Sequence, residues 1–146
     1  MQSGLYIVAT PIGNMGDMTT RAVEVLSAAN AVACEDTRVT GKLMRHHGLS
    51  SRLVRYDEHN APRTRPGLIK QLLAGEVVAL VSDAGTPLVS DPGYKLVREA
   101  VEAGISVYPL PGASSVLAAL AVSGLPATAF CSRDFCRPNK LPDAVN

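Results

Sequence analysis

Short runs of consecutive apolar residues alternate along this chain with longer segments in which apolar residues recur every three or four positions. The first pattern is typical of buried parallel strands, and the second is typical of amphipathic helices. Strands are expected at residues 5–10, 31–34, 52–56, 77–81 and 105–110. Helices are expected at about 20–29, 38–47, 68–74, 91–103 and 115–123. This succession of five strand–helix units predicts an α/β fold with a five-stranded, mainly parallel, doubly wound sheet.

The expected helix ends carry recognisable signals. Thr19 or Thr20 is a natural N-cap for the first helix. A glycine directly follows each of the last four helices, at positions 48, 75, 104 and 124. Glycine is the usual residue there because the chain turns through a positive φ. Ligands of such sheets bind outside the carboxyl ends of the strands, so the loops that follow the strands are the candidate site.

The loop after the fourth expected strand, residues 82–93, is the most unusual of these. Strand-to-helix loops in α/β units usually have about 2 to 6 residues. This loop is longer and rich in Gly, Pro, Ser, Thr and Asp, and it ends with Asp91 as a helix cap and Pro92 at the first helical position. It is interpreted as a ligand-binding loop, and the alternative is an over-long connection.

Composition narrows the class of protein. The 146 residues are 47% hydrophobic and 18% charged, which fits one globular domain. The start lacks a cationic signal segment, no run has the length of a membrane span, and the three cysteines form no CxxC pair. These features indicate a cytoplasmic protein without a metal motif. The absence of GxGxxG and GxxxxGK[ST] argues against NAD binding and P-loop hydrolysis.

Charge is unevenly distributed. The segment from Arg38 to Lys70 has eight basic and two acidic residues, a balance of +6, whereas the rest of the chain sums to −5. A polyanionic partner such as RNA is one explanation, and an unevenly charged solvated surface is the other.

Five short runs together resemble one family: ATPIGN at 9–14, EDTR at 35–38, EHN at 58–60, SDAGTPLVSDPG at 82–93 and PLPG at 109–112. They resemble the 16S ribosomal RNA (cytidine-2′-O)-methyltransferases, within the wider tetrapyrrole methylase superfamily. The resemblance implies S-adenosylmethionine as methyl donor and the 2′-hydroxyl of a cytidine in 16S rRNA of the small ribosomal subunit as acceptor. It also implies a strand order of 3-2-4-1-5, a homodimer, and a donor cleft between two α/β domains.

The resemblance also assigns candidate site residues. The cofactor-binding candidates lie on three loops: Pro11, Asp83, Gly85, Thr86, Pro87, Ser90, Ser114 and Ser115. The catalytic candidates follow the second and third strands: Glu35, Asp36, Arg38, Glu58 and His59. A ribose hydroxyl is weakly acidic, so one of the carboxylates or the histidine is expected to act as a base. Alternatively, Asp36 or Thr37 caps the next helix with an ion pair to Arg38, and His59 fills a hydrogen-bonding gap in its loop.

The resemblance covers about residues 4–130, so residues 1–130 are expected to form the first domain of such an enzyme. Residues 131–146 lack helical or strand periodicity and are expected to be an irregular tail. Without a second domain the donor cleft lacks one wall, and the chain alone is expected to be inactive. Two further functions stay open, a methylase of small tetrapyrroles and a non-catalytic fragment that dimerises or touches RNA.

Overall fold

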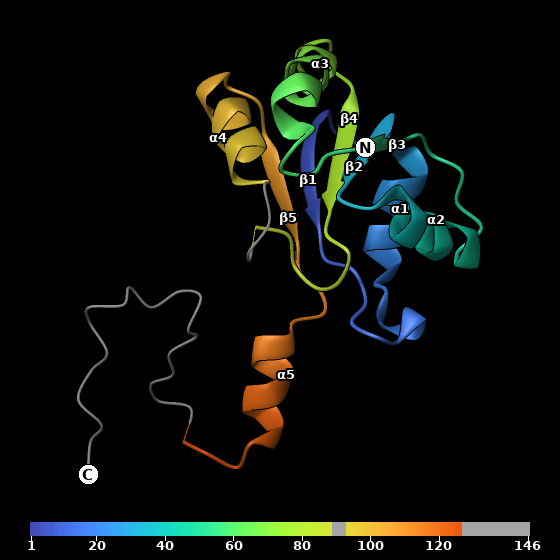
Figure 1. Cartoon of the computed structure of the whole chain (residues 1–146), viewed down its shortest axis with the longest axis vertical. Coiled ribbons are helices and arrows are strands. Elements are labelled where there is room, and N and C mark those ends of the chain that lie inside the picture. Colours follow the sequence, from blue (N-terminus) through green and yellow to red (C-terminus); the bar gives the residue numbers. More distant parts are fainter. Residues whose placement is uncertain (89–92, 127–146) are drawn as a thin grey trace. The chain divides into compact units, whose positions relative to one another are not determined.

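A five-stranded sheet organises the molecule, which is described here by a computed structural model of residues 1–88 and 93–126 (Figure 1). The strands are β1 (Gly4–Val8), β2 (Ala31–Cys34), β3 (Leu53–Arg55), β4 (Val77–Val81) and β5 (Val107–Leu110). They are ordered β3-β2-β4-β1-β5, and each neighbouring pair is parallel. The expected α/β class, parallel pairing and strand order are therefore confirmed. Pro109, which lacks an N–H group, is tolerated because β5 lies at the sheet edge.

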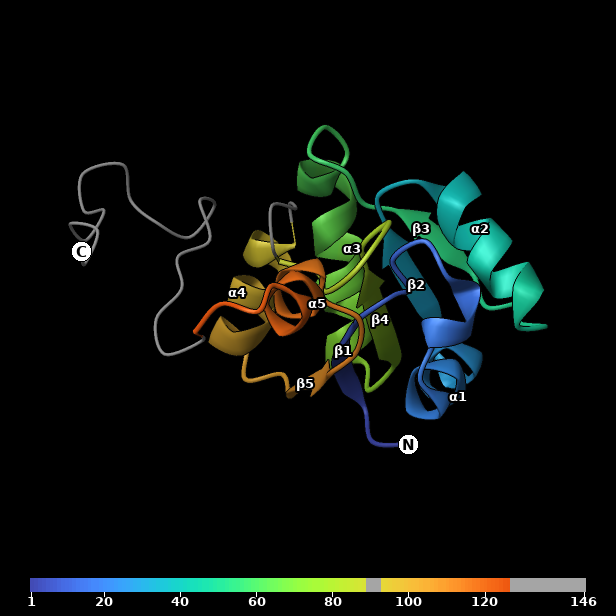
Figure 2. The same ribbon diagram turned by 90° about the horizontal axis from the view of Figure 1, so that it is seen from below.

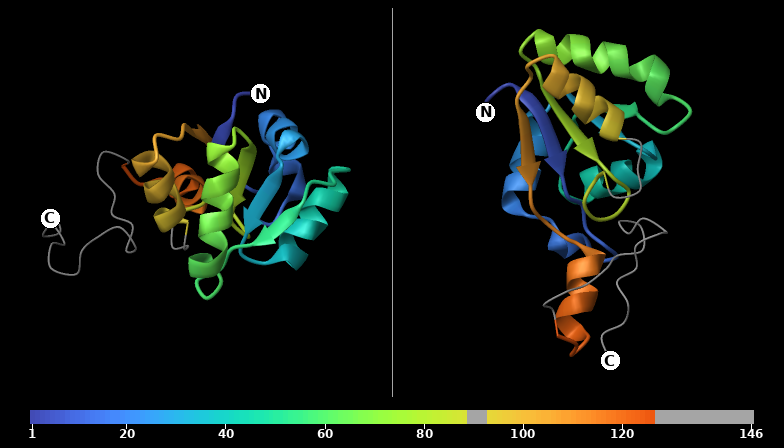
Figure 3. Two further views of the ribbon diagram at one scale, coloured as in Figure 1. Left: turned by 90° about the horizontal axis from the view of Figure 1, so that it is seen from above. Right: turned by 90° about the vertical axis from the view of Figure 1, so that its left-hand side faces the viewer.

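Helices cover both faces of the sheet (Figures 2 and 3). On one face α1 (Thr20–Ala28) and α2 (Thr37–His46) pack on side chains such as Val8 and Val32. On the other face α3 (Ala61–Leu73) and α4 (Tyr94–Glu102) pack on alternate residues of the same strands. The three inner strands, β1, β2 and β4, are buried along their full length. This double burial explains why they read as continuous apolar runs in the sequence.

Thr19 and the glycines expected at the helix ends have the capping roles that the sequence predicts. The Thr19 hydroxyl accepts a hydrogen bond from the Ala22 N–H at 3.2 Å and caps α1. The glycines that follow the last four helices all have positive φ, between 67° and 84°. The chain therefore turns sharply at the end of each of these helices.

Several boundaries differ from the expectation, most of all at α3. This helix begins at Ala61, seven residues before the helix body expected at 68–74, and it contains Pro62 and Pro66. Pro62 occupies the first turn, where its missing N–H has no helical partner to lose. The strands β3 and β5 are shorter than expected, at 3 and 4 residues. The expected cap of α4, Asp91 with Pro92, lies outside the described residues.

The chain divides into two compact units, Met1–Ser114 and Ser115–Asn146. The second unit contains α5 (Ser115–Val122), an apolar helix without buried residues in which Leu117 is 60% exposed. The expected domain limit at residue 130 and the tail at 131–146 lie outside the described residues. In the described part of the chain, no helix combines the length and apolar character that crossing a membrane requires.

Candidate functional site

The loops at the carboxyl ends of the strands are held together by backbone hydrogen bonds. The β4 loop folds back on the end of β1, where Thr10 N–H donates to the Gly85 carbonyl at 2.9 Å and Gly85 N–H donates to Thr10 at 3.0 Å. The Thr10 hydroxyl also donates to the Ser82 carbonyl at 3.0 Å. Gly85 has a φ of 83°, a conformation that other residues rarely adopt. The start of the loop is therefore fixed over the end of β1.

The loop after β5 joins the same assembly. The Thr86 hydroxyl donates to the Ala113 carbonyl at 3.3 Å. Gly112 lies so close to Ala9 that a Cβ at position 112 would be 2.8 Å from the Cβ of Ala9. Three loops that are remote in the sequence thus form one closely packed edge.

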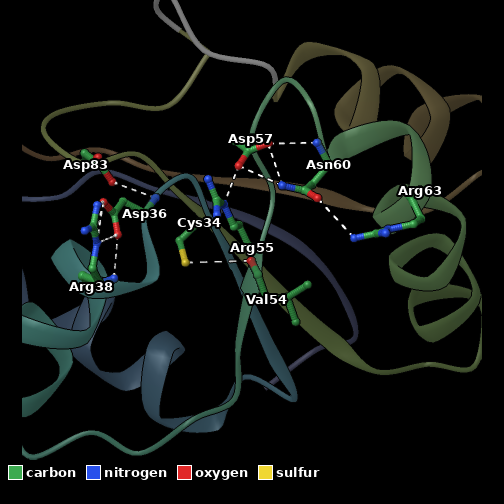
Figure 4. Close-up of polar contacts among 9 residues, drawn as sticks. All are labelled: Cys34, Asp36, Arg38, Val54, Arg55, Asp57, Asn60, Arg63 and Asp83. Atoms are coloured by element: carbon green, nitrogen blue, oxygen red, sulfur yellow. Dashed lines mark hydrogen bonds and ion pairs between the residues drawn. The ribbon is translucent and has the colours of Figure 1, made fainter.

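Asp83 connects the β4 loop to the β2 loop (Figure 4). Its Oδ1 accepts a hydrogen bond from the Asp36 backbone N–H at 3.3 Å. Asp36 in turn caps α2 by accepting from Arg38 N–H at 2.8 Å, and its other oxygen pairs with the Arg38 guanidinium at 2.7 Å. These bonds to Arg38 hold the pKa of Asp36 far below its usual range. A carboxylate with such a low pKa is a poor proton acceptor, so Asp36 is a weak candidate for the base. Its hydrogen bonds instead match the alternative role, a helix cap with an ion pair to Arg38.

A second polar network orders the β3 loop (Figure 4). Asp57 accepts hydrogen bonds from the Asn60 backbone N–H at 2.8 Å and side chain at 2.9 Å, and it pairs with Arg55. Arg63 donates to the Asn60 side-chain oxygen at 3.3 Å. Hydrogen bonding from Asn60, with the nearby Arg55, lowers the pKa of Asp57 to about 2. The turn that carries Glu58 and His59 is thereby fixed at both ends, and neither side chain is taken up by the network.

An open groove of about 690 Å³ runs between these two loops. All five catalytic candidates line it, namely Glu35, Asp36, Arg38, Glu58 and His59, together with Thr37, Arg55, Asp57 and Asp83. The structure thus brings together residues from the ends of β2, β3 and β4. Sequence reasoning placed the loop that begins at Asp57 at this edge of the sheet, but it named neither Arg55 nor Asp57 as a site residue.

The groove has an acidic character. Five carboxylates line it, against two guanidinium groups and one histidine. Such a surface favours a cationic ligand and disfavours a phosphate group. Within the described residues, no cluster of His, Cys, Asp and Glu is arranged to hold a metal ion.

A smaller pocket of about 150 Å³ adjoins the groove and shares Asp83 with it. Its walls come from the loop after β1, the β4 loop and the inner side of α2, and they include Pro11 and Val39. Of the cofactor-binding candidates, only Pro11 and Asp83 line this pocket.

The other cofactor-binding candidates are placed differently. Gly85 and Pro87 are buried, Thr86 is exposed, and Ser114 is half-buried at the end of the first unit. Ser115 begins α5 in the second unit. Ser90 lies outside the described residues.

The basic segment is partly neutralised. Arg38, Arg55 and Arg65 pair with Asp36, Asp57 and Glu99. Other cations of the segment, Lys42, Arg45, Arg52 and Lys70, are exposed and have no carboxylate partner within the described part of the chain. The free positive charge therefore lies outside the acidic groove, with Lys42 and Arg45 on α2.

A model of the tetrapyrrole (corrin/porphyrin) methylases matches residues 4–145. The chain belongs to this family. The family membership inferred from the sequence motifs is confirmed. Tetrapyrrole methylases depend on S-adenosylmethionine.

Curated relatives indicate which kind of enzyme in the tetrapyrrole methylase family this chain is similar to. The chain is 56% identical over 135 residues to ribosomal RNA small subunit methyltransferase I of Mesorhizobium japonicum, covering 92% of this chain and 46% of the relative. It is 52% identical over 134 residues to the Escherichia coli protein of the same name, covering 92% and 47%. The chain therefore spans about half the length of the curated relatives that it matches.

Solved structures of other proteins have a similar fold. Uroporphyrin-III-C-methyltransferase from Thermus thermophilus has a TM-score of 0.65 and 27% identity, over 88% of this chain and 56% of that one. A conserved hypothetical protein from Aeropyrum pernix has a TM-score of 0.67 and 25% identity, over 86% and 44%.

The groove and its edge suit the methyl donor of this family. S-Adenosylmethionine carries a sulfonium and an ammonium cation, and the acidic groove presents Asp83, Glu35 and Glu58. Gly85 and Gly112 allow the loops to meet at this closely packed edge, because a Cβ at these positions would press against Ile12 and Ala9 respectively. The exposed Thr86 hydroxyl adds a short polar group beside it.

Proposed function

We propose that this chain is the donor- and acceptor-binding part of an S-adenosylmethionine-dependent ribosomal RNA methyltransferase. Its reaction is methylation of the 2′-hydroxyl of a cytidine in 16S rRNA. The relatives at 45–56% identity, named ribosomal RNA small subunit methyltransferase I, support an rRNA substrate. The homodimer and the cytoplasmic location stay predictions.

The observation that carries the proposal is the composition of the 690 Å³ groove. The loops after β2, β3 and β4 converge there, and they place fixed carboxylates beside groups that are available for proton transfer. Methyl transfer from a sulfonium is an in-line displacement, so positioning of the two reactants supplies much of the acceleration. The hydrogen bonds of Asp83 and Asp57 provide that positioning because they hold the walls of the groove in place.

Each residue of the groove has a separate role in the proposed reaction. When bound, S-adenosylmethionine would supply an electrophilic methyl group from its sulfonium and would leave as a neutral thioether. The ribose 2′-oxygen forms the new bond to the methyl carbon, and its proton passes to the carboxylate of Glu58 or the imidazole of His59. Asp36 keeps the α2 N-terminus and Arg38 in place and remains ionised throughout.

RNA phosphates lie outside the groove in this proposal. The acidic wall repels them, whereas the exposed Lys42 and Arg45 on α2 attract them. Phosphate contacts orient the RNA without reading its sequence. The nucleotide to be methylated then enters the groove from the side of α2.

A second candidate is methylation of a small tetrapyrrole. The similarity to uroporphyrin-III-C-methyltransferase, at 27% identity, favours it. The higher identity to the ribosomal RNA methyltransferases and the exposed basic residues on α2 favour the RNA substrate.

A chimera tests the proposal directly. This chain replaces the matching segment of the Mesorhizobium japonicum relative, and methyl transfer to small-subunit rRNA and to uroporphyrinogen III is measured with labelled S-adenosylmethionine. We expect a 2′-O-methylcytidine in the RNA product and no labelled tetrapyrrole. Transfer only to the tetrapyrrole would select the second candidate, and methylation of an RNA base would refute the ribose assignment.

The same assay separates the two candidates for the base. Glu58→Gln and His59→Gln keep the approximate size of each side chain and remove its proton-accepting group. General-base catalysis typically contributes about 10²- to 10⁴-fold. We expect one variant to lose activity by that amount with donor binding unchanged, and the other to lose much less.

A further inference from the structure

The 150 Å³ pocket between α2 and the loop after β1 is large enough for one aromatic ring. A cavity of about 150 Å³ in a protein core holds one benzene molecule. The pocket therefore has room for one six-membered ring and is open on the side of the groove. Pro11, Val39 and Leu43 line it with apolar surface suited to the faces of such a ring.

Asn14 supplies polarity at this pocket. Its side-chain oxygen accepts a hydrogen bond from Gly16 N–H at 3.0 Å and caps the short helix η1 (Met15–Asp17). That bond orients the amide, whose NH₂ group has no acceptor within the described residues. A ring with a carbonyl oxygen would meet this donor, and both pyrimidine bases of RNA carry one at the 2-position.

The pocket and the groove share Asp83, so they are adjacent parts of one surface. A base is attached directly to its ribose, and a ring in the pocket would leave the ribose at this shared wall. The 2′-hydroxyl would then face the groove that contains Glu58 and His59. The exposed cations of α2, the helix that also forms one side of the pocket, would meet the flanking phosphates.

We propose that this pocket is the base-selection site of the enzyme, and that it receives the pyrimidine ring of a nucleotide turned out of its RNA stack. The inference rests on the proposed function. Enzymes that modify a single nucleotide commonly extrude it into a fitted pocket. The apolar walls contact the faces of the ring, and the Asn14 amide donates to its carbonyl oxygen, a group that adenine lacks.

Binding of short RNAs to the 146-residue chain tests the pocket. Fluorescence anisotropy compares a nine-residue oligoadenylate with the same strand carrying one central cytidine. We expect about tenfold tighter binding of the cytidine strand. Val39 is 39% exposed, so Val39→Phe can fill the pocket from its edge without disturbing the core. This variant should bind both strands with the affinity that the wild type shows for oligoadenylate.

Two further variants control for folding. Val101→Phe makes the same change on α4, where Val101 is 60% exposed, and it should keep the full preference. Asn14→Asp keeps the capping oxygen and replaces the donor by a carboxylate, so it should lower the preference at least threefold with an unchanged melting temperature.

The outcomes separate this inference from the proposed function. Equal binding of both strands by the wild type overturns the pocket assignment, as does an undiminished preference in Val39→Phe. In either case the proposed function still stands if the chimera methylates RNA. If Val39→Phe instead weakens S-adenosylmethionine binding by the chimera, the pocket holds part of the donor and the inference is wrong. No binding of either strand, with an inactive chimera, overturns both.

Discussion

The carboxylate of Asp83 accepts a hydrogen bond from the backbone N–H of Asp36, across 47 residues of sequence and between two neighbouring strands. This bond joins the loop after β4 to the N-terminus of α2. It also places Asp83 in the wall of both the acidic groove and the smaller pocket. One side chain therefore influences the geometry of two cavities and the charge that a cationic ligand would meet.

Replacing Asp83 should impair donor binding more than folding. Asp83→Ala removes both the charge and the bond to Asp36, whereas Asp83→Asn keeps an oxygen acceptor and removes only the charge. Because Asp83 is exposed, we expect the stability to change by only about 0.5 kcal/mol. We expect at least a tenfold loss of S-adenosylmethionine affinity for Asp83→Ala and a smaller loss for Asp83→Asn, which calorimetry on the chimera measures. Unchanged affinity in the alanine variant would remove Asp83 from the donor site.

The close approach of Gly112 to Ala9 predicts a strongly coupled pair. Gly112→Ala would place two Cβ atoms 2.8 Å apart, and neither belongs to a flexible side chain that can move away. Overpacking of this kind typically costs about 1–3 kcal/mol. Chemical denaturation of both single variants and the double variant measures the coupling.

The double variant with Ala9→Gly should regain most of the stability lost in Gly112→Ala, because the contact no longer exists. Gly67→Ala is the matched control, since a Cβ at position 67 of α3 meets nothing within 4 Å. Additive losses in the double variant would contradict the proposed contact.

Local sequence patterns were sufficient for the fold class, whereas the strand order came from the family resemblance. The apolar runs of β1 and β4 and the glycines after the helices predicted the parallel sheet, because both signals depend on a few adjacent residues. The apolar spacing located only the later part of α3, because its first turns contain Pro62 and Pro66 and depend on the hydrogen bond between Asp57 and Asn60 at the entry to the helix.

Charge was harder to interpret from the sequence. Arg65 belongs to the basic segment, but its side chain is 20% exposed and pairs with Glu99 of α4, 34 residues away. Hydrogen bonding to Tyr56 and to Glu99 raises the pKa of Arg65. A charge balance along the chain cannot reveal such a remote partner, so the +6 segment overstated the charge available to RNA.

The exposed cations of α2 should set the salt dependence of RNA binding. Removing one phosphate contact lowers the magnitude of the slope of log affinity against log salt concentration by roughly 0.7 to 0.9. Lys42→Gln with Arg45→Gln should therefore flatten the slope by up to about twice that amount. Anisotropy titrations between low and moderate salt measure it.

Two controls assign the effect to α2. Lys95→Gln, at an exposed site on α4, should leave the slope unchanged. Arg65→Gln should lower stability, because it breaks the link between α3 and α4, with little effect on the slope. A flattened slope in Arg65→Gln alone would place the RNA against α3 instead.

The Asp57 network should make stability depend on acid in a defined range. The pKa of Asp57 is about 2 in the folded protein, against an ordinary value of 3.8, so the carboxylate favours the folded state when it is ionised. Its contribution is complete above about pH 4 and is lost as the pH falls toward 2, because the unfolded chain binds the proton first.

Asp57→Asn removes this contribution at every pH. Urea unfolding should thus show a gap between wild type and variant at pH 7 that narrows steadily between pH 4 and pH 2. Asn60→Ala, which removes the side-chain donor but keeps the backbone N–H, should show a smaller gap with the same pH dependence. A gap that stays constant down to pH 2 would mean that Asp57 acts through packing, and that its charge does not hold the turn carrying Glu58 and His59.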